Sequence, residues 1–238
     1  MRLFSQNMER SRHVHRIIPY ICDTKPDVVC LQELTPGDIK LIGAATGLRF
    51  CHFVQMAVHP ADNQPFGIGI FARTPFLETD CIAYAGSTGA EATFDRSTAD
   101  TRLATARYAL ALARLTVGGL EFTVATTHFP WSPEGQVLGF QTAAVQRLAD
   151  MVRHRSVVLT GDFNAPRGGP IFAAVAGVLT DCVPPDIMTS IDPLLHRAGA
   201  LELMVDGLFS SRDYRVSEVR MHSGLSDHQG LSARIEQV

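Results

Sequence analysis

The 238-residue chain lacks several features that would assign it to a special class of protein. Charged residues make up only 19% of it, so long disordered runs of charge are excluded. No run of about 18 apolar residues is present to span a bilayer, although 46% of the chain is hydrophobic. Residues 1–13 contain no apolar stretch of the kind that a secretory signal needs. We therefore expect a soluble, cytoplasmic, monomeric protein with no stable membrane insertion.

Cysteine is too scarce and too widely spaced for a structural role. The number of cysteines is odd, and no CxxC pair occurs among Cys22, Cys30, Cys51, Cys81 and Cys182. We therefore expect neither a disulfide framework nor a thiolate zinc site.

An excess of positive charge is also missing. The chain has 21 basic and 24 acidic residues, which gives a net charge of −3 with histidine neutral. The chain-wide basic footprint of many nucleic-acid-binding proteins is therefore absent. A local basic patch is compatible with this total, because binding depends on where the charges lie.

No linker, repeat or low-complexity tract divides the sequence, so we expect one domain over residues 1–238. The recurring pattern is an apolar strand, a polar turn, and then a helix or another strand. Residues 28–31 form a continuous apolar run, typical of a strand buried on both faces of a layered α/β fold. The expected strands are 2–7, 28–31, 66–72, 107–115, 120–126, 156–160, 204–210, 214–220 and 231–235. The expected helices are 11–23 (kinked or shortened by Pro19), 36–47, 136–153 and 170–177, with irregular segments at 84–101 and 182–200.

Polar residues suited to metal or phosphate chemistry follow many of these apolar runs. A lone Asp or Asn after a strand is usually a turn or cap residue. The ends of central strands in layered α/β folds share one edge, however, where ligands bind. Eight such residues therefore favour a shared site for a metal and a polyanion. They are Asn7, Glu33, His128, Asp162, Asn164, Asp206, Asp227 and His228.

The residue types in this set narrow the chemistry. Carboxylates and carboxamides without a Cys ligand suit a hard cation such as Mg²⁺ or Mn²⁺. The spacing Asp162-x-Asn164 places both side chains on one side of an extended segment. A His beside a carboxylate, as in Asp227-His228, can act as an acid, a base or a phosphate partner. The set suits metal-assisted attack of water on phosphorus, which needs charge neutralisation and in-line positioning.

The same residues lie in motifs that resemble those of the endonuclease/exonuclease/phosphatase superfamily. The resemblance covers nearly the whole chain, in order, through Asn7, PDVVCLQEL, FGIGIFARTPF, TVATTHF, TGDFNAP, VDGLFSS and LSDHQGL. It implies a four-layer α/β sandwich, with two mixed β-sheets packed face to face and helices outside. It also implies Mg²⁺-dependent hydrolysis of phosphate esters, with Mn²⁺ as a substitute.

The resemblance also implies roles for the metal and water ligands. Glu33 would bind the metal, assisted by Asn7 and Asp227. Asp162 would position or deprotonate the attacking water, and Asn164 would hold the phosphate.

The two histidines have implied roles as well. His228 would contact the phosphate or serve as a base, with Asp206 orienting its ring. His128 would bind the phosphate or protonate the leaving oxygen.

The substrate is left open between classes. The expected function is that of a nuclease-like phosphodiesterase. Its expected partner is a phosphate-ester substrate, and nucleic acid is one candidate for it. The alternatives are a small-molecule or lipid phosphatase or phosphodiesterase, and a non-catalytic module that binds a phosphorylated ligand. Met8-Glu9-Arg10 after Asn7 departs from the abasic-site endonucleases. Substrate selection is expected in residues 57–65, 84–101, 130–135 and 182–200, with Trp131 either walling the cleft or simply packing.

Overall fold

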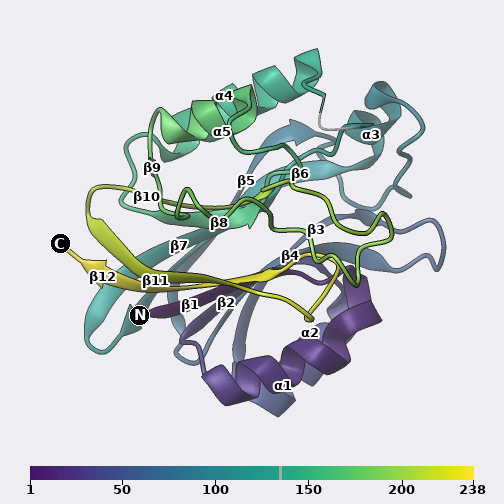
Figure 1. Cartoon of the computed structure of the whole chain (residues 1–238). Coiled ribbons are helices and arrows are strands. Elements are labelled where there is room, and N and C mark those ends of the chain that lie inside the picture. The colour runs from purple at the N-terminus through teal and green to yellow at the C-terminus, as the bar shows by residue number, and fades with distance from the viewer. Residues whose placement is uncertain (134–135) are drawn as a thin grey trace.

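The computed structural model describes residues 1–133 and 136–238, so part of the expected 130–135 segment lies outside the described residues. Two six-stranded mixed β-sheets face each other, with helices outside (Figure 1). In strand order, the first sheet contains β11 (Tyr214–His222), β12 (Gly230–Gln237), β1 (Arg2–Asn7), β2 (Val28–Leu34), β4 (Pro65–Ala72) and β3 (Phe50–Val58). The second contains β5 (Phe76–Gly86), β6 (Arg107–Val117), β7 (Leu120–His128), β8 (Val158–Asp162), β10 (Asp206–Ser210) and β9 (Thr180–Asp181).

Helices cover the outer faces and complete the expected sandwich. The first sheet is covered by α1 (Val14–Thr24), which follows the 3₁₀ turn η1 (Arg10–His13), and by α2 (Pro36–Thr46) (Figure 1). The second sheet is covered by α4 (Gly139–Val152) and α5 (Pro170–Ala176), and α3 (Ala99–Thr105) precedes β6. The four-layer prediction is therefore confirmed. None of the helices in the described ranges is long and apolar enough to cross a membrane.

The continuous apolar run of β2 is explained by the layers on either side of it. Val28 and Cys30 belong to the core that both sheets share, whereas Val29 and Leu31 pack with α1 and α2. Alternate side chains of a strand point to opposite faces. A strand buried on both faces therefore needs an apolar residue at every position.

Some of the local predictions were wrong. The expected irregular segment 84–101 is shorter, because β5 runs to Gly86 and α3 begins at Ala99. The start of α3 is fixed by Thr98 and Thr101, whose side chains each bond to the other residue's backbone N–H. Pro19 does not interrupt α1, which continues past it with this residue on the exposed side.

The topology gathers strand ends at one place. In the first sheet β1 and β2 are parallel, and Asn7 at the end of β1 pairs with Gln32. In the second sheet β7 and β8 are parallel, and His128 pairs with Asp162. Because the carboxyl ends of parallel strands meet at one edge, each sheet presents polar side chains at the same rim.

Candidate active site

Three of the expected residues lie side by side across the second sheet. His128 at the end of β7 pairs with Asp162 at the end of β8, and Asp162 pairs with Asp206 at the start of β10. The first sheet reaches this row through Asn7, whose Nδ2 donates to Oδ2 of Asp162 at 3.0 Å. The predicted residues from the two sheets therefore form one site.

One atom, Oδ2 of Asp162, is the centre of the site. Besides Nδ2 of Asn7, it lies 3.5 Å from Nε2 of His128 and 3.9 Å from Nε2 of His228. The other oxygen, Oδ1, accepts the backbone N–H of Asn164 at 2.7 Å and so closes the turn after β8. Asp162 is buried. One of its oxygens closes the turn, and the other faces the side chains of the site.

His228 and Asp206 form a buried pair beside this centre. Nδ1 of His228 lies 2.7 Å from Oδ2 of Asp206. Burial alone would lower the pKa of His228, but the charges of Asp206 and Asp162 and the bond with Asp206 raise it well above its ordinary value. The two carboxylates therefore favour the protonated ring, and its Nε2 lies on the side of Asp162.

Backbone contacts fix both partners of the pair. Nε2 of Gln6 donates to the carbonyl of His228 at 2.9 Å. The Ser190 hydroxyl oxygen accepts the backbone N–H of Asp206 at 3.1 Å. The imidazole and carboxylate are thus held at a set separation by groups from two other parts of the chain.

Asn164 departs from the expected extended geometry. β8 ends at Asp162, and Asn164 has a φ of 48°, a left-handed conformation that Asn tolerates better than most residues. Its Nδ2 donates to the carbonyl of Phe129 at 2.8 Å. The amide therefore joins the turn after β8 to the residue that follows His128, rather than lying alongside Asp162 on a straight strand.

Glu33 is placed by a bulge in β2. Gln32 pairs with Ile68 and Leu34 with Gly67, so Glu33 is the extra residue, and its φ is 55°. Bulges redirect a side chain, and a non-glycine residue at positive φ carries strain of about 1 kcal/mol or more.

The surroundings of the Glu33 carboxylate fit a bound cation. Burial raises its pKa, and the charges of Asp227 and Asp162 raise the pKa further against the opposing effect of the two site histidines. Asn7 adds an amide oxygen, which also accepts the backbone N–H of Glu9 at 3.0 Å. An oxygen-donor set with crowded negative charge is what a hard divalent cation requires.

Within the described ranges, the group whose ligand-type atoms lie close enough together for a metal does not include Glu33. Asp162, Asp206 and His228 each place one such atom within 4.8 Å of the others. Asp206 and His228 already satisfy each other, and Asn7 donates to Asp162. Two of these three side chains therefore already have a polar partner within the chain.

Sequence reasoning missed residues that support the site. Nε2 of Gln32 donates to the Thr126 hydroxyl at 2.9 Å and so links β2 to β7 across the core. Burial lowers the pKa of His196, and the charges of Asp227 and His228 also act on this ring, which places it near the site. Gln32 lies inside the PDVVCLQEL motif, but only Glu33 was singled out there, and no motif contains His196.

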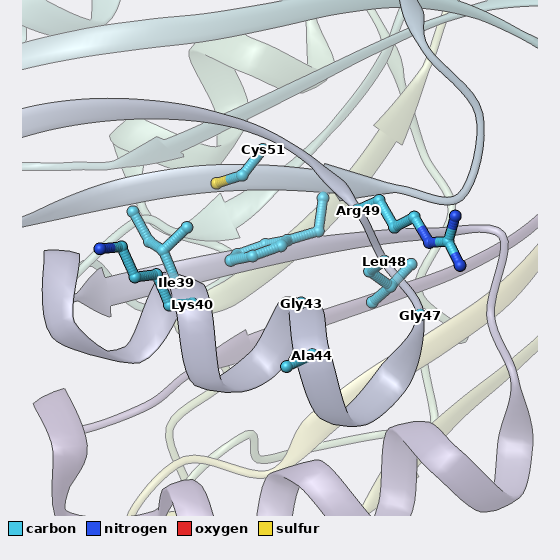
Figure 2. A pocket seen from close by; sticks show the side chains of 9 residues that line it. Ile39, Lys40, Gly43, Ala44, Gly47, Leu48, Arg49 and Cys51 are labelled. Atoms are coloured by element: carbon cyan, nitrogen blue, oxygen red, sulfur yellow. The ribbon is translucent and has the colours of Figure 1, made fainter.

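A separate hollow of about 550 Å³ lies between α2 and the outer face of β3 and β4. Its lining includes the apolar residues Ile39, Leu48 and Phe71. The cations Lys40 and Arg49 also line it (Figure 2). None of the eight predicted site residues lines it, so its shape does not bear on the chemistry at the strand ends.

Two face-to-face sheets with carboxylates and histidines at one rim are the features of the sandwich-fold phosphoesterases. The chain belongs to the Endonuclease/Exonuclease/phosphatase family, which matches it over residues 3–228. The resemblance inferred from the motifs is therefore confirmed. No curated protein matches the chain.

Solved structures with the same fold include proteins of different description. A family member from Leptotrichia buccalis is 15% identical, covers 99% of each chain and has a TM-score of 0.75. D. rerio TDP2 complexed with a single-strand DNA product is 17% identical, with a TM-score of 0.68. The match covers 100% of this chain and 99% of the TDP2 chain. The mannosyl-6-phosphatase of Bacteroides thetaiotaomicron is 16% identical (99% of each) with a TM-score of 0.67. At these identities the comparison establishes the fold.

Proposed function

We propose that this protein is a metal-dependent phosphodiesterase that hydrolyses phosphate esters by attack of water on phosphorus. The observation that carries the proposal is the carboxylate of Asp162, held within 4 Å of two histidines, one of them paired with Asp206. A carboxylate between imidazoles can orient a water molecule and accept its proton, while the imidazoles bind the developing phosphate charge.

Each side chain then has a defined task. Asp162 positions the water and takes its proton at Oδ2. His228, kept cationic by Asp206, donates its Nε2–H to a phosphate oxygen. The Asn164 amide binds a second oxygen, and His128 protonates the leaving oxygen.

Glu33 would hold the metal, with Asn7 and Asp227 as neighbouring oxygen donors. When bound, a divalent cation such as Mg²⁺, or Mn²⁺ in its place, neutralises phosphate charge. Burial and the charges of Asp227 and Asp162 raise the pKa of Glu33, and this carboxylate would ionise more readily beside a bound cation.

We further propose a nuclease-like diester substrate, with small-molecule or lipid phosphatase action as the alternative. The family includes neighbours with either description: TDP2 is complexed with single-strand DNA product, and another neighbour is a mannosyl-6-phosphatase. The cytoplasmic location, the single domain and the monomeric state expected from the sequence remain part of this proposal.

The decisive experiment measures hydrolysis of bis(p-nitrophenyl) phosphate and of p-nitrophenyl phosphate with and without Mg²⁺. We expect metal-dependent turnover, faster on the diester. Asp162→Asn and His228→Ala are each expected to lower kcat by about 10²–10⁴-fold, the usual contribution of a general acid or base.

Asp23→Asn is the matched control, because Asp23 is an exposed carboxylate on α1. It should turn over both substrates like the wild type. Undiminished activity in Asp162→Asn would refute the site assignment. Tight phosphate binding with no turnover under any divalent metal would instead identify a binding module.

A further inference from the structure

Ser190 is a fully buried residue in the segment between β9 and β10. Its backbone carbonyl accepts the N–H of Gln229, the residue after His228, at 2.7 Å. Its hydroxyl oxygen accepts the N–H of Asp206 at 3.1 Å. One residue therefore bonds both to the chain beside the imidazole and to the chain that carries the carboxylate.

The residues that follow Ser190 hold it against the segment that carries the imidazole. Ile191 forms an isolated antiparallel bridge with His228. The next N–H, that of Asp192, donates to the carbonyl of Asp227 at 2.9 Å. The position of Ser190 is therefore set by backbone pairing with the residues around His228.

The proton of the Ser190 hydroxyl has a fixed direction. The hydroxyl oxygen accepts two backbone N–H groups, from Val205 at 3.0 Å and from Asp206 at 3.1 Å. A hydroxyl group has two lone pairs and one proton. Both lone pairs are therefore used, and the proton is left for the side chain of Asp206, with which the Ser190 side chain also bonds.

This bond acts on the charge that Asp206 needs in order to pair with His228. Burial raises the pKa of Asp206, and the charge of Asp162 raises it further. The charge of His228, its hydrogen bond and the hydrogen bond from Ser190 lower this pKa. A buried carboxylate with too few donors takes up a proton and can no longer stabilise an imidazolium. Ser190 therefore supplies the carboxylate with a donor besides the imidazole.

We propose that Ser190 is a positioning residue of the site, whose hydroxyl and carbonyl hold the Asp206 carboxylate and the His228 imidazole in register. This inference rests on the proposed function and extends it by a residue that lies behind the pair. Groups that orient a site residue from behind affect activity without touching the substrate. Loss of the hydroxyl should therefore slow the chemical step and leave substrate binding nearly unchanged.

Ser211, just after β10 and at the other end of this strand from Asp206, provides a matched control. Its hydroxyl oxygen also accepts a backbone N–H, that of Val157, at 3.1 Å. The same hydroxyl also donates to an aspartate, Asp213, at 2.9 Å. Ser190→Ala and Ser211→Ala thus remove hydroxyls with the same kinds of partner, so a merely structural effect would appear in both variants.

Steady-state hydrolysis of bis(p-nitrophenyl) phosphate with Mg²⁺ compares the variants. We expect Ser190→Ala to lower kcat about 10- to 100-fold, the range for outer partners of site residues, with little change in KM. Ser190→Cys keeps the shape of the side chain but donates weakly, so its kcat should lie between those of the wild type and Ser190→Ala. Ser211→Ala should keep the wild-type kcat. Wild-type kcat in both Ser190 variants would overturn the proposal.

A double-mutant cycle tests whether Ser190 acts through Asp206. Residues of one hydrogen-bond network have non-additive effects. Ser190→Ala should therefore lower kcat much less in the Asp206→Asn background than in the wild type. An equal fold-loss in both backgrounds would show that Ser190 acts independently of Asp206 and would refute the positioning role.

The proton between Nδ1 of His228 and the Asp206 carboxylate gives a readout that needs no turnover. A proton in a short charge-assisted bond is strongly deshielded and appears at low field in a ¹H NMR spectrum. The signal is assigned by its loss in Asp206→Asn. We expect it to move upfield, or to be lost by exchange with solvent, in Ser190→Ala and to be unchanged in Ser211→Ala.

The NMR and kinetic results separate this inference from the proposed function. If the wild type hydrolyses no phosphate ester with any divalent metal but Ser190→Ala loses the His228 signal, the positioning role stands and the hydrolase assignment fails. If the wild type is active and Ser190→Ala has the wild-type kcat and an unchanged signal, the hydrolase stands and the positioning role fails.

Discussion

Asp206 and His228 meet at 2.7 Å although they belong to opposite sheets of the sandwich: Asp206 begins β10, and His228 lies just before β12. The carboxylate keeps the ring charged and fixes which nitrogen faces Asp162. In the proposed mechanism, Asp206 would therefore act on the phosphate only through His228.

Replacing Asp206 by Asn tests this arrangement. The amide has nearly the same shape but cannot stabilise an imidazolium, so we expect kcat on bis(p-nitrophenyl) phosphate to fall about 10²–10⁴-fold. The free energy of unfolding should fall by only about 1–3 kcal/mol, as for one buried hydrogen bond. Steady-state kinetics and thermal unfolding measure both, with Asp23→Asn as the control. Wild-type kcat in Asp206→Asn would contradict the positioning role.

Asn164 offers a test that separates backbone from side chain. Asn164→Gly keeps the left-handed φ of 48° without strain, whereas Asn164→Ala adds strain as well as removing the amide. We expect both variants to lose about 10²–10³-fold in kcat/KM, as when one transition-state hydrogen-bond donor is removed. Recovery of activity in the Gly variant alone would show that only the turn geometry matters.

Metal binding at Glu33 should be visible as stability. Without metal, Glu33→Gln removes one of three crowded carboxylates, so its melting temperature should equal or exceed that of the wild type. Addition of Mg²⁺ should raise the melting temperature of the wild type more than that of Glu33→Gln, because a ligand that binds only the folded state stabilises it. Each ~1 kcal/mol corresponds to about 2–4 °C in a chain of this size. Thermal unfolding in EDTA and in Mg²⁺ measures the change in melting temperature. The control is Glu202→Gln, because Glu202 is exposed. If Mg²⁺ raised the melting temperature of Glu33→Gln as much as that of the wild type, Glu33 would not be a metal ligand.

Gly161 is expected to be irreplaceable. Its φ is 146°, and a Cβ there would lie 2.0 Å from the carbonyl oxygen of Thr127 in the neighbouring strand. Gly161→Ala should therefore destabilise the protein by about 3 kcal/mol or more. Gly139→Ala is the matched control, since no atom lies within 4 Å of its Cβ position, and it should change stability by less than about 1 kcal/mol. Chemical denaturation compares the two; equal stabilities would show that β7 and β8 can move apart.

The parts of the fold that sequence reasoning predicted well are those with a strong local pattern. β2 has a continuous apolar run, the β6–β7 hairpin has Gly118 and Gly119 at positive φ, and α2 ends at Gly47 with a φ of 74°. β5 was missed because it lies at a sheet edge, where most of its residues are exposed and no apolar pattern forms. Its position is set by pairing with β6, which a local pattern does not reveal.

The eight expected site residues came from motifs at strand ends, but their geometry depends on tertiary structure. The bulge that makes Glu33 an unpaired residue requires the partner strand β4. The cation–π contact of Arg102 with Trp131 joins residues 29 positions apart, for which spacing carries no signal. Residue types and motifs could therefore name the candidate site residues, whereas the contacts that position them could not be predicted.

The pairing of β1 with β12 joins strands that are made at very different times during synthesis of the chain. The strand that ends in Asn7 is synthesised more than 200 residues before the strand that follows His228. Until β12 is added, β1 has an open edge and Asp162 lacks one of its two imidazole neighbours. A nascent chain that has not yet reached His228 and β12 therefore lacks part of the candidate site, however completely its earlier strands have folded.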